Sequence, residues 1–243
     1  MAVRAMPPRR ARAHAGAMKT TTRSRICAFL LVFGAVAFAA ADLLRRLVEP
    51  GGNPDAQALT QAVAQHPASW ETAGLLSIVA GMCLAVSALA LVPQHGVRGA
   101  RITASGAVMM SLGAMASIGH AVAFYSPYSL FAAAHTSASQ LAAIDAASES
   151  SLQLLVLIYT FMAGMTIGPI VLFIGLHRAH RIPVWSVAAV IVFVVCGSTG
   201  GILPGAIGAA AALAAFVPVA GTLLHAMPGN ASPPLGSSPL KAA

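Results

Sequence analysis

Two ionisable side chains, Asp42 and His120, stand inside long apolar segments of the sequence. Ionisable residues are costly in the core of a bilayer, so a residue of this kind is a candidate functional site by default. A histidine beside a carboxylate can relay protons or contribute ligands to a divalent metal ion. The sequence therefore predicts a candidate proton or metal site from Asp42 and His120, with His66 and Glu71 supplied by the neighbouring segments.

The depth of the two residues follows from the rise of an α-helix. At about 1.5 Å per residue, Asp42 lies roughly 24 Å beyond Ile26, and His120 lies roughly 27 Å beyond Ile102. Both segments are expected to run in the same direction across the membrane. The two side chains therefore approach the same boundary, and they meet if their helices are neighbours.

A purely structural interpretation of the same residues stays open. Asp42 precedes Arg45 and Arg46 by three and four positions, which is the spacing of ion pairs on one helix. His120 can stay neutral near the boundary and bond to a backbone carbonyl. The sequence leaves these two interpretations side by side.

Motifs for catalysis and for cofactor binding are absent. The patterns HExxH, GxSxG, the Walker loop and GxGxxG do not occur. Haem held by two histidines needs both of them within spans, and His120 alone lies there. Cys27, Cys83 and Cys196 are isolated in apolar runs, without the spacing of a metal finger. We therefore expect no catalytic residue and no cofactor, and the chain is expected to be non-enzymatic.

The elements that must position the candidate residues are apolar helices. The sequence is 58% hydrophobic and 8% charged, whereas soluble domains carry about 25% charged residues. A chain this poor in charge cannot cover a surface that faces water, so its apolar runs face lipid. The expected fold class is all-α, a polytopic membrane helix bundle with the lipid bilayer as its partner.

Six apolar segments are predicted to be transmembrane helices, because about 20 apolar residues cross a ~30 Å hydrocarbon core. They are residues 26–44, 72–92, 102–124, 152–176, 184–203 and 206–224. The first also fits a signal peptide that is cleaved near Ala41, which would leave five spans. Short interfacial helices are expected in the two longer connections, residues 45–71 and 126–150.

The basic residues predict the orientation. Half of the 14 lysines and arginines precede the first segment, and most of the others follow the second and fourth segments. Basic residues stay on the cytoplasmic side, so both termini are predicted to be cytoplasmic, N-in and C-in. Arg45 and Arg46 are the exception, on the opposite side. The net charge of +8 is thus a topology signal, and no nucleic-acid partner is expected.

One membrane domain, residues 26–225, is expected between two tails. Residues 1–25 are predicted to be a disordered basic cytoplasmic tail, and residues 226–243 a disordered tail rich in proline, glycine and serine. Met18 opens MKTTTRSR, which is an ordinary start. Translation from Met1 and translation from Met18 therefore stay open.

Glycines at intervals of four predict where the spans pack closely, because small residues allow two helix backbones to approach. Gly164 and Gly168 form such a pair in the fourth segment, and Gly197, Gly201 and Gly205 form a double pair around the fifth. Packing within the bundle is the expected use of these faces. A homo-oligomer or another membrane partner is the alternative.

Several short motifs occur in a familiar order. They are Pro54-Asp55, His66-Pro67, Leu91-Val92-Pro93, Gly96-Val97-Arg98-Gly99-Ala100-Arg101 and Gly119-His120-Ala121. In this order the chain resembles a group of uncharacterised six-span integral membrane proteins of high-GC bacteria, over roughly residues 26–225. The resemblance implies a multi-pass protein of the bacterial inner (plasma) membrane, and it implies no activity.

Two functions are the main candidates from the sequence, and an intramembrane enzyme is a third with the least support. The absence of catalytic motifs and the scarcity of polar residues in the spans favour a non-enzymatic structural or partner-binding membrane protein. The alternative is a small transporter, a proton- or metal-coupled carrier that uses Asp42 and His120. A carrier requires a polar path between its helices, so the two functions differ in what the interior of the bundle should contain.

Overall fold

The computed structural model describes residues 8–51, 55–92 and 98–225, and every regular element in these ranges is an α-helix. The predicted all-α fold is therefore confirmed. The helices are α1 (Pro8–Val48), α2 (Ala56–Gln65), α3 (Pro67–Leu89), α4 (Ala100–Ala133), α5 (Ala138–Glu149), α6 (Leu152–Arg178), α7 (Val184–Gly197) and α8 (Ile202–His225). The short helices α2 and α5 lie in the two longer connections, where short helices were expected.

Five helices in the described ranges are long and apolar enough to cross a membrane, which makes the chain a multi-pass membrane protein. They are Thr22–Val48, Pro67–Leu89, Ala100–Ala133, Leu152–Arg178 and Ile202–Leu224. Helix α7 has 14 residues and is therefore about 21 Å long, shorter than a ~30 Å hydrocarbon core. The segment expected over 184–203 thus ends its helix early, at Gly197.

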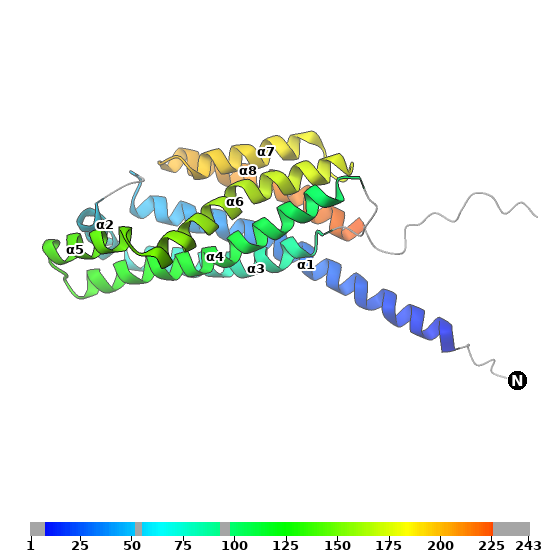
Figure 1. Ribbon diagram of the computed structural model, residues 1–243, viewed down its shortest axis with the longest axis horizontal. Helices are drawn as coiled ribbons and strands as arrows, with labels where there is room; N and C mark the ends of the chain where they lie inside the picture. The colour runs from blue at the N-terminus through cyan, green and yellow to red at the C-terminus, as the bar shows by residue number, and fades with distance from the viewer. Residues whose placement is uncertain (1–7, 52–54, 93–97, 226–243) are drawn as a thin grey trace, which may run out of the picture.

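Contacts among six helices of the described ranges close a ring, which Figure 1 shows from the side. Around it, α1 packs on α3, α3 on α4, α4 on α6, α6 on α7, α7 on α8, and α8 on α1. The contact between α6 and α7 is the least extensive of these six. Helices α2 and α5 cover one end of the ring, the α2–α5 end. The start of α1 and the end of α8 lie at the opposite, terminal end.

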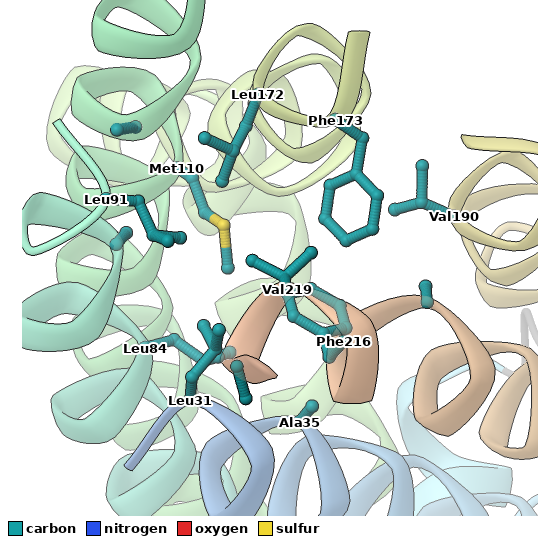
Figure 2. Packing of buried hydrophobic residues seen from close by; sticks show 14 of the residues in the cluster. Leu31, Ala35, Leu84, Leu91, Met110, Leu172, Phe173, Val190, Phe216 and Val219 are labelled. Atoms are coloured by element: carbon teal, nitrogen blue, oxygen red, sulfur yellow. The ribbon is translucent and has the colours of Figure 1, made fainter. Parts of the chain in front are cut away.

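The half of the ring nearest the terminal end is filled by apolar side chains (Figure 2). Leu31 of α1, Leu84 of α3, Met110 of α4, Phe173 of α6 and Phe216 of α8 point toward one another there, and all are at most 2% exposed. Such close packing leaves no room for a wide polar channel at this level.

A second apolar cluster fixes the α2–α5 end. The fully buried Trp70 of α3 contacts the rings of Phe124 and Tyr125 of α4, with ring centroids 5.3 and 4.8 Å away. Its indole Nε1 donates a hydrogen bond to the main-chain oxygen of Tyr125 at 2.9 Å. Val63 of α2 is buried in the same cluster. These contacts hold α4 in place at Phe124 and Tyr125, about one turn beyond His120.

Helices α4 and α6 pack backbone against backbone. Gly164 of α6 lies against Gly113 of α4, and Gly168 lies against the main chain of Met110. A Cβ atom on Gly168 would stand 2.6 Å from the Met110 nitrogen, closer than packed atoms tolerate. The pair predicted at Gly164 and Gly168 is therefore used inside the chain, between two of its own helices.

The first helix is longer than the sequence suggests. Helix α1 begins at Pro8, so residues 8–25 are helical where a disordered tail was expected. Alanine and arginine favour helix, proline suits a first helical position, and the long apolar segment supplies the nucleus from which the helix extends. Residues 1–7 and the expected C-terminal tail, 226–243, lie outside the described residues.

Candidate functional site

A cavity of ≈ 250 Å³ lies inside the ring, in the half nearest the α2–α5 end. Asp42 of α1 and His120 of α4 both line it. His66 and Glu71 do not, because they stand exposed where α3 begins. The structure thus brings two of the four predicted residues to one cavity and leaves the other two outside.

Asp42 is paired on its own helix. Its Oδ1 accepts a hydrogen bond from Arg45 Nη2 at 3.0 Å, and its Oδ2 accepts one from Arg46 Nε at 2.6 Å. This is the pairing that the i,i+3 and i,i+4 spacing suggested. Each carboxylate oxygen therefore already has a cationic partner.

Arg46 binds the end of helix α7. Its Nη1 donates to the main-chain oxygens of Thr199 and Gly201 at 2.5 and 2.8 Å, and its Nη2 donates to those of Cys196 and Gly197 at 3.0 and 3.5 Å. With the bond to Asp42, all the guanidinium N–H groups have acceptors. The last carbonyls of a helix lack partners within the helix and attract positive charge. Arg46, 1% exposed, therefore allows α7 to end inside the protein.

The glycines predicted to form one packing face around the fifth segment occupy three different elements instead. Gly197 ends α7, Gly201 has φ +97° in the turn, and Gly205 lies in the first turn of α8. A Cβ on Gly205 would stand 2.7 Å from Arg46 Cδ. The prediction of a shared face is wrong because α7 ends at Gly197 and the chain turns before α8 begins at Ile202. Gly205 then serves a different purpose, which is to make room for that arginine.

Arg45 faces the cavity with unused hydrogen-bonding capacity. Its side chain is 23% exposed and lines the cavity. Its bond to Asp42 is the one hydrogen bond that its guanidinium makes within the described ranges. A guanidinium carries five N–H donors, so most of those of Arg45 remain available to a molecule in the cavity.

His120 is held between two aromatic rings. Its imidazole stacks on Phe161 of α6, with centroids 4.8 Å apart at 16°, and on Phe124, with centroids 5.6 Å apart at 14°. No hydrogen bond of its ring nitrogens occurs in the described part of the chain, so the carbonyl partner of the structural interpretation is not found there. His120 also borders a second cavity, of ≈ 350 Å³, that Asp145 lines.

The remaining wall of the first cavity is mostly apolar, and one side is open. Its apolar part is formed by Phe38, Phe124, Phe161, Met162, Met165 and Phe193. Met162 of α6 and both Gly197 and Ser198 at the end of α7 line the cavity and are also exposed. The opening therefore lies along the contact between α6 and α7.

A metal ion gains no support from this arrangement. In the described ranges no three histidine, cysteine, aspartate or glutamate side chains are grouped so that they could hold one. Both oxygens of Asp42 already accept hydrogen bonds from guanidinium groups. The donors that face the cavity suit an acceptor-rich ligand better than a cation.

The sequence predicted the pairing of Arg45 and Arg46 with Asp42, but not the binding of Arg46 to the end of α7 or the position of Arg45 in the cavity wall. One signal pointed to such roles: Arg45 and Arg46 stand alone on the side that the other basic residues avoid. Two arginines retained against the general charge bias indicate a specific task. The acceptors of Arg46, at and just beyond the end of α7, are 150 to 155 residues away in sequence, and no local pattern reveals them.

Comparison with known proteins gives no match: no family model, no curated protein and no solved structure is similar to the chain at a significant level. The resemblance to six-span membrane proteins of high-GC bacteria therefore stays a prediction. The interpretation of the site has to come from its own geometry.

Proposed function

We propose that this chain is a small-molecule carrier of the bacterial plasma membrane, with its binding site in the cavity that Asp42 and His120 line. The observation that carries the proposal is that these two residues, from helices that are not neighbours in the ring, line one cavity within the bundle. We propose no enzymatic step, and the metal-coupled form of the carrier receives no support from the donor set.

In the proposed topology all six ring helices lie in the membrane and both termini are cytoplasmic. The terminal end carries Arg98 and Arg101 before and at the start of α4, and Arg178 and Arg181 at and after the end of α6. All six acidic residues stand on helices or loops at the other end. This separation favours a cytoplasmic terminal end. The short α7 can end within the membrane because Arg46 satisfies its last carbonyls.

The unused polar groups favour a carrier over a purely structural protein. Within a membrane, a polar group without a partner costs free energy, so a bundle evolved for packing alone would pair or replace it. Arg45 and His120 instead direct donors or acceptors into a space that no side chain fills. A ligand is the simplest partner for them.

The uneven filling of the ring favours alternating access. Apolar packing closes the terminal half of the ring (Figure 2), whereas the cavity occupies the other half. In carriers, one part of the bundle moves against the other around a central site, so that the site opens to each side in turn. The arrangement described here then corresponds to a state that is closed toward the cytoplasm.

The experiment uses Cys196, a native thiol in the cavity wall. Cys27 and Cys83 are buried elsewhere and are replaced by alanine. Right-side-out and inside-out vesicles are then treated with the membrane-impermeant reagent 2-sulfonatoethyl methanethiosulfonate. A carrier exposes Cys196 to each side in turn, so modification is expected in both preparations. The variant that retains only Cys27 serves as the buried control.

Modification of Cys196 from a single side, or from neither, would contradict the proposed carrier. A structural or partner-binding membrane protein, the alternative function, predicts that one-sided or absent result. The same two preparations report the topology, because the more reactive one shows which side the described state faces.

A further inference from the structure

We infer that the ligand of this cavity is a small amphipathic carboxylate that reaches the site from the lipid, between α6 and α7. This inference rests on the proposed function and specifies its ligand. The acid group is placed at the guanidinium of Arg45 beside His120, and the apolar body lies along the aromatic wall.

The charge expected of the ligand follows from the hydrogen bonds that Asp42, Arg45 and Arg46 already make. Both carboxylate oxygens of Asp42 already accept a hydrogen bond, one from Arg45 and the other from Arg46. Arg46 is fully engaged by Asp42 and the end of α7. Arg45 alone lines the cavity as a cation with donors to spare. Glu49, just beyond the end of α1, accepts a hydrogen bond from the Gly51 nitrogen at 2.7 Å and does not line the cavity.

The geometry of the donor selects the acid group. A guanidinium is a planar fork that binds a carboxylate through two parallel hydrogen bonds, a match that a single alcohol or amine cannot make. The imidazole of His120 offers a second, fixed polar edge, because stacking between Phe124 and Phe161 holds its plane. Both polar groups therefore suit an anion with two oxygens.

The size and the lining of the cavity select the rest of the molecule. A volume of ≈ 250 Å³ is below the ~300–1,000 Å³ of typical sites for drug-sized ligands. Four phenylalanine and two methionine side chains form much of the wall. The ligand is thus expected to be small and apolar apart from its acid group.

The route to the site is the opening between α6 and α7. These helices make the least extensive contact in the ring, and a Cβ on Gly197 would meet no atom within 4 Å. Apolar side chains around the opening, such as Val195 and Ile167, are 55% and 50% exposed and would face lipid. A molecule dissolved in the bilayer can therefore enter sideways with its chain trailing through the opening.

The test measures binding to the full-length protein in lipid nanodiscs, by titration of four probes. Decanoate and 1-decanol form one pair, which differs in the acid group alone; benzoate and benzyl alcohol form a water-soluble pair. Decanoate is expected to bind at least about tenfold more tightly than decanol. Protection of Cys196 from the methanethiosulfonate reagent over the same concentrations would place decanoate in the cavity.

Variants separate the role of Arg45 from general charge effects. Arg45→Gln keeps the bond between Asp42 and Arg46, and it is expected to weaken decanoate binding about tenfold. Arg101→Gln, an exposed position at the opposite end of the bundle, is the matched control and should bind as the unmodified protein does. If Arg45→Gln fails to fold, Arg45→Lys replaces it, and a severalfold loss is expected because lysine retains the charge without the planar fork.

Equal binding of decanoate and decanol, or undiminished binding by the Arg45 variant, would overturn the inferred ligand class. If benzoate bound and decanoate did not, the inferred entry of the ligand from lipid would be overturned. The carrier proposal stands or falls separately, because two-sided reactivity of Cys196 in vesicles requires no knowledge of the ligand.

Discussion

Arg46 of α1 donates a hydrogen bond from Nη1 to the main-chain oxygen of Thr199, 2.5 Å away, just beyond the end of α7. Through this bond and its neighbours, a side chain of the first helix satisfies the carbonyls at the end of the seventh. The turn that follows, with Gly201 in a left-handed conformation, then returns the chain into α8. The cavity wall on this side exists because α7 stops here.

Replacement of Arg46 is expected to unfold much of the α7–α8 hairpin. Arg46→Met leaves Asp42 without one cation and the α7 carbonyls without donors, and the loss of one member of a buried ionic group costs about 3–5 kcal/mol. The free energy of unfolding in mixed detergent micelles measures this loss. Arg45→Met, at a more exposed position, is the control and should cost at most about 1 kcal/mol. Equal losses in the two variants would contradict the assigned role.

The close contact between α4 and α6 predicts opposite effects for two glycine substitutions. Gly168→Ala forces a Cβ against the Met110 backbone and is expected to destabilise the protein by about 1–3 kcal/mol. Gly221→Ala in α8 meets nothing within 4 Å, so it should be neutral or stabilising by up to about 1 kcal/mol. Thermal unfolding of both variants in one detergent gives the comparison. A stable Gly168→Ala protein would show that the two helices can separate freely.

The predicted site residues are expected to divide into two classes. His120→Leu removes a polar edge of the cavity but no hydrogen bond within the described ranges, so binding of decanoate should fall severalfold with little change in stability. His66→Leu, at the exposed start of α3, should change neither. Ligand titration and thermal unfolding measure the two properties in parallel. A severalfold loss of binding in His66→Leu would place the site elsewhere.

A bulky residue at the opening is expected to slow entry of the ligand. The Cβ that Gly197→Phe adds has no neighbouring atom within 4 Å, and the position is exposed, so stability should change by less than about 1 kcal/mol. The association rate of decanoate should fall at least about fivefold, whereas Gly221→Phe, on a different helix, should leave it unchanged. Stopped-flow measurement with a fluorescent fatty acid gives both rates. An unaltered rate in Gly197→Phe would exclude this route.

The long apolar helices and the pairing of Asp42 were within reach of the sequence, because both depend on local spacing. Hydropathy over about 20 residues identifies a span, and the i,i+3 and i,i+4 positions of Arg45 and Arg46 place them beside Asp42. The depth of His120 along its helix follows from the rise per residue in the same way. To predict that His120 shares a cavity with Asp42, the order of the helices around the ring would also have been needed.

The fifth segment shows what local patterns do not contain. Its apolar run extends to Leu203, so hydropathy predicts a helix over 184–203 and a reversal at Pro204. The chain reverses earlier, at 198–201, and Pro204 takes a place in the first turn of α8, where proline is well tolerated. Gly201, with φ +97°, lies in this turn, and Arg46, distant in sequence, binds the carbonyls at the end of α7, a contact that no rule based on neighbouring residues predicts.

The position of Trp70 gives the protein a built-in optical probe. Its indole contacts Phe124 and Tyr125, and both of these residues also line the cavity. The second tryptophan, Trp185, lies at the start of α7 and is 51% exposed. In a Trp185→Phe protein, fluorescence emission would therefore come from a single buried indole one side chain away from the cavity, and occupancy could be followed without any attached label.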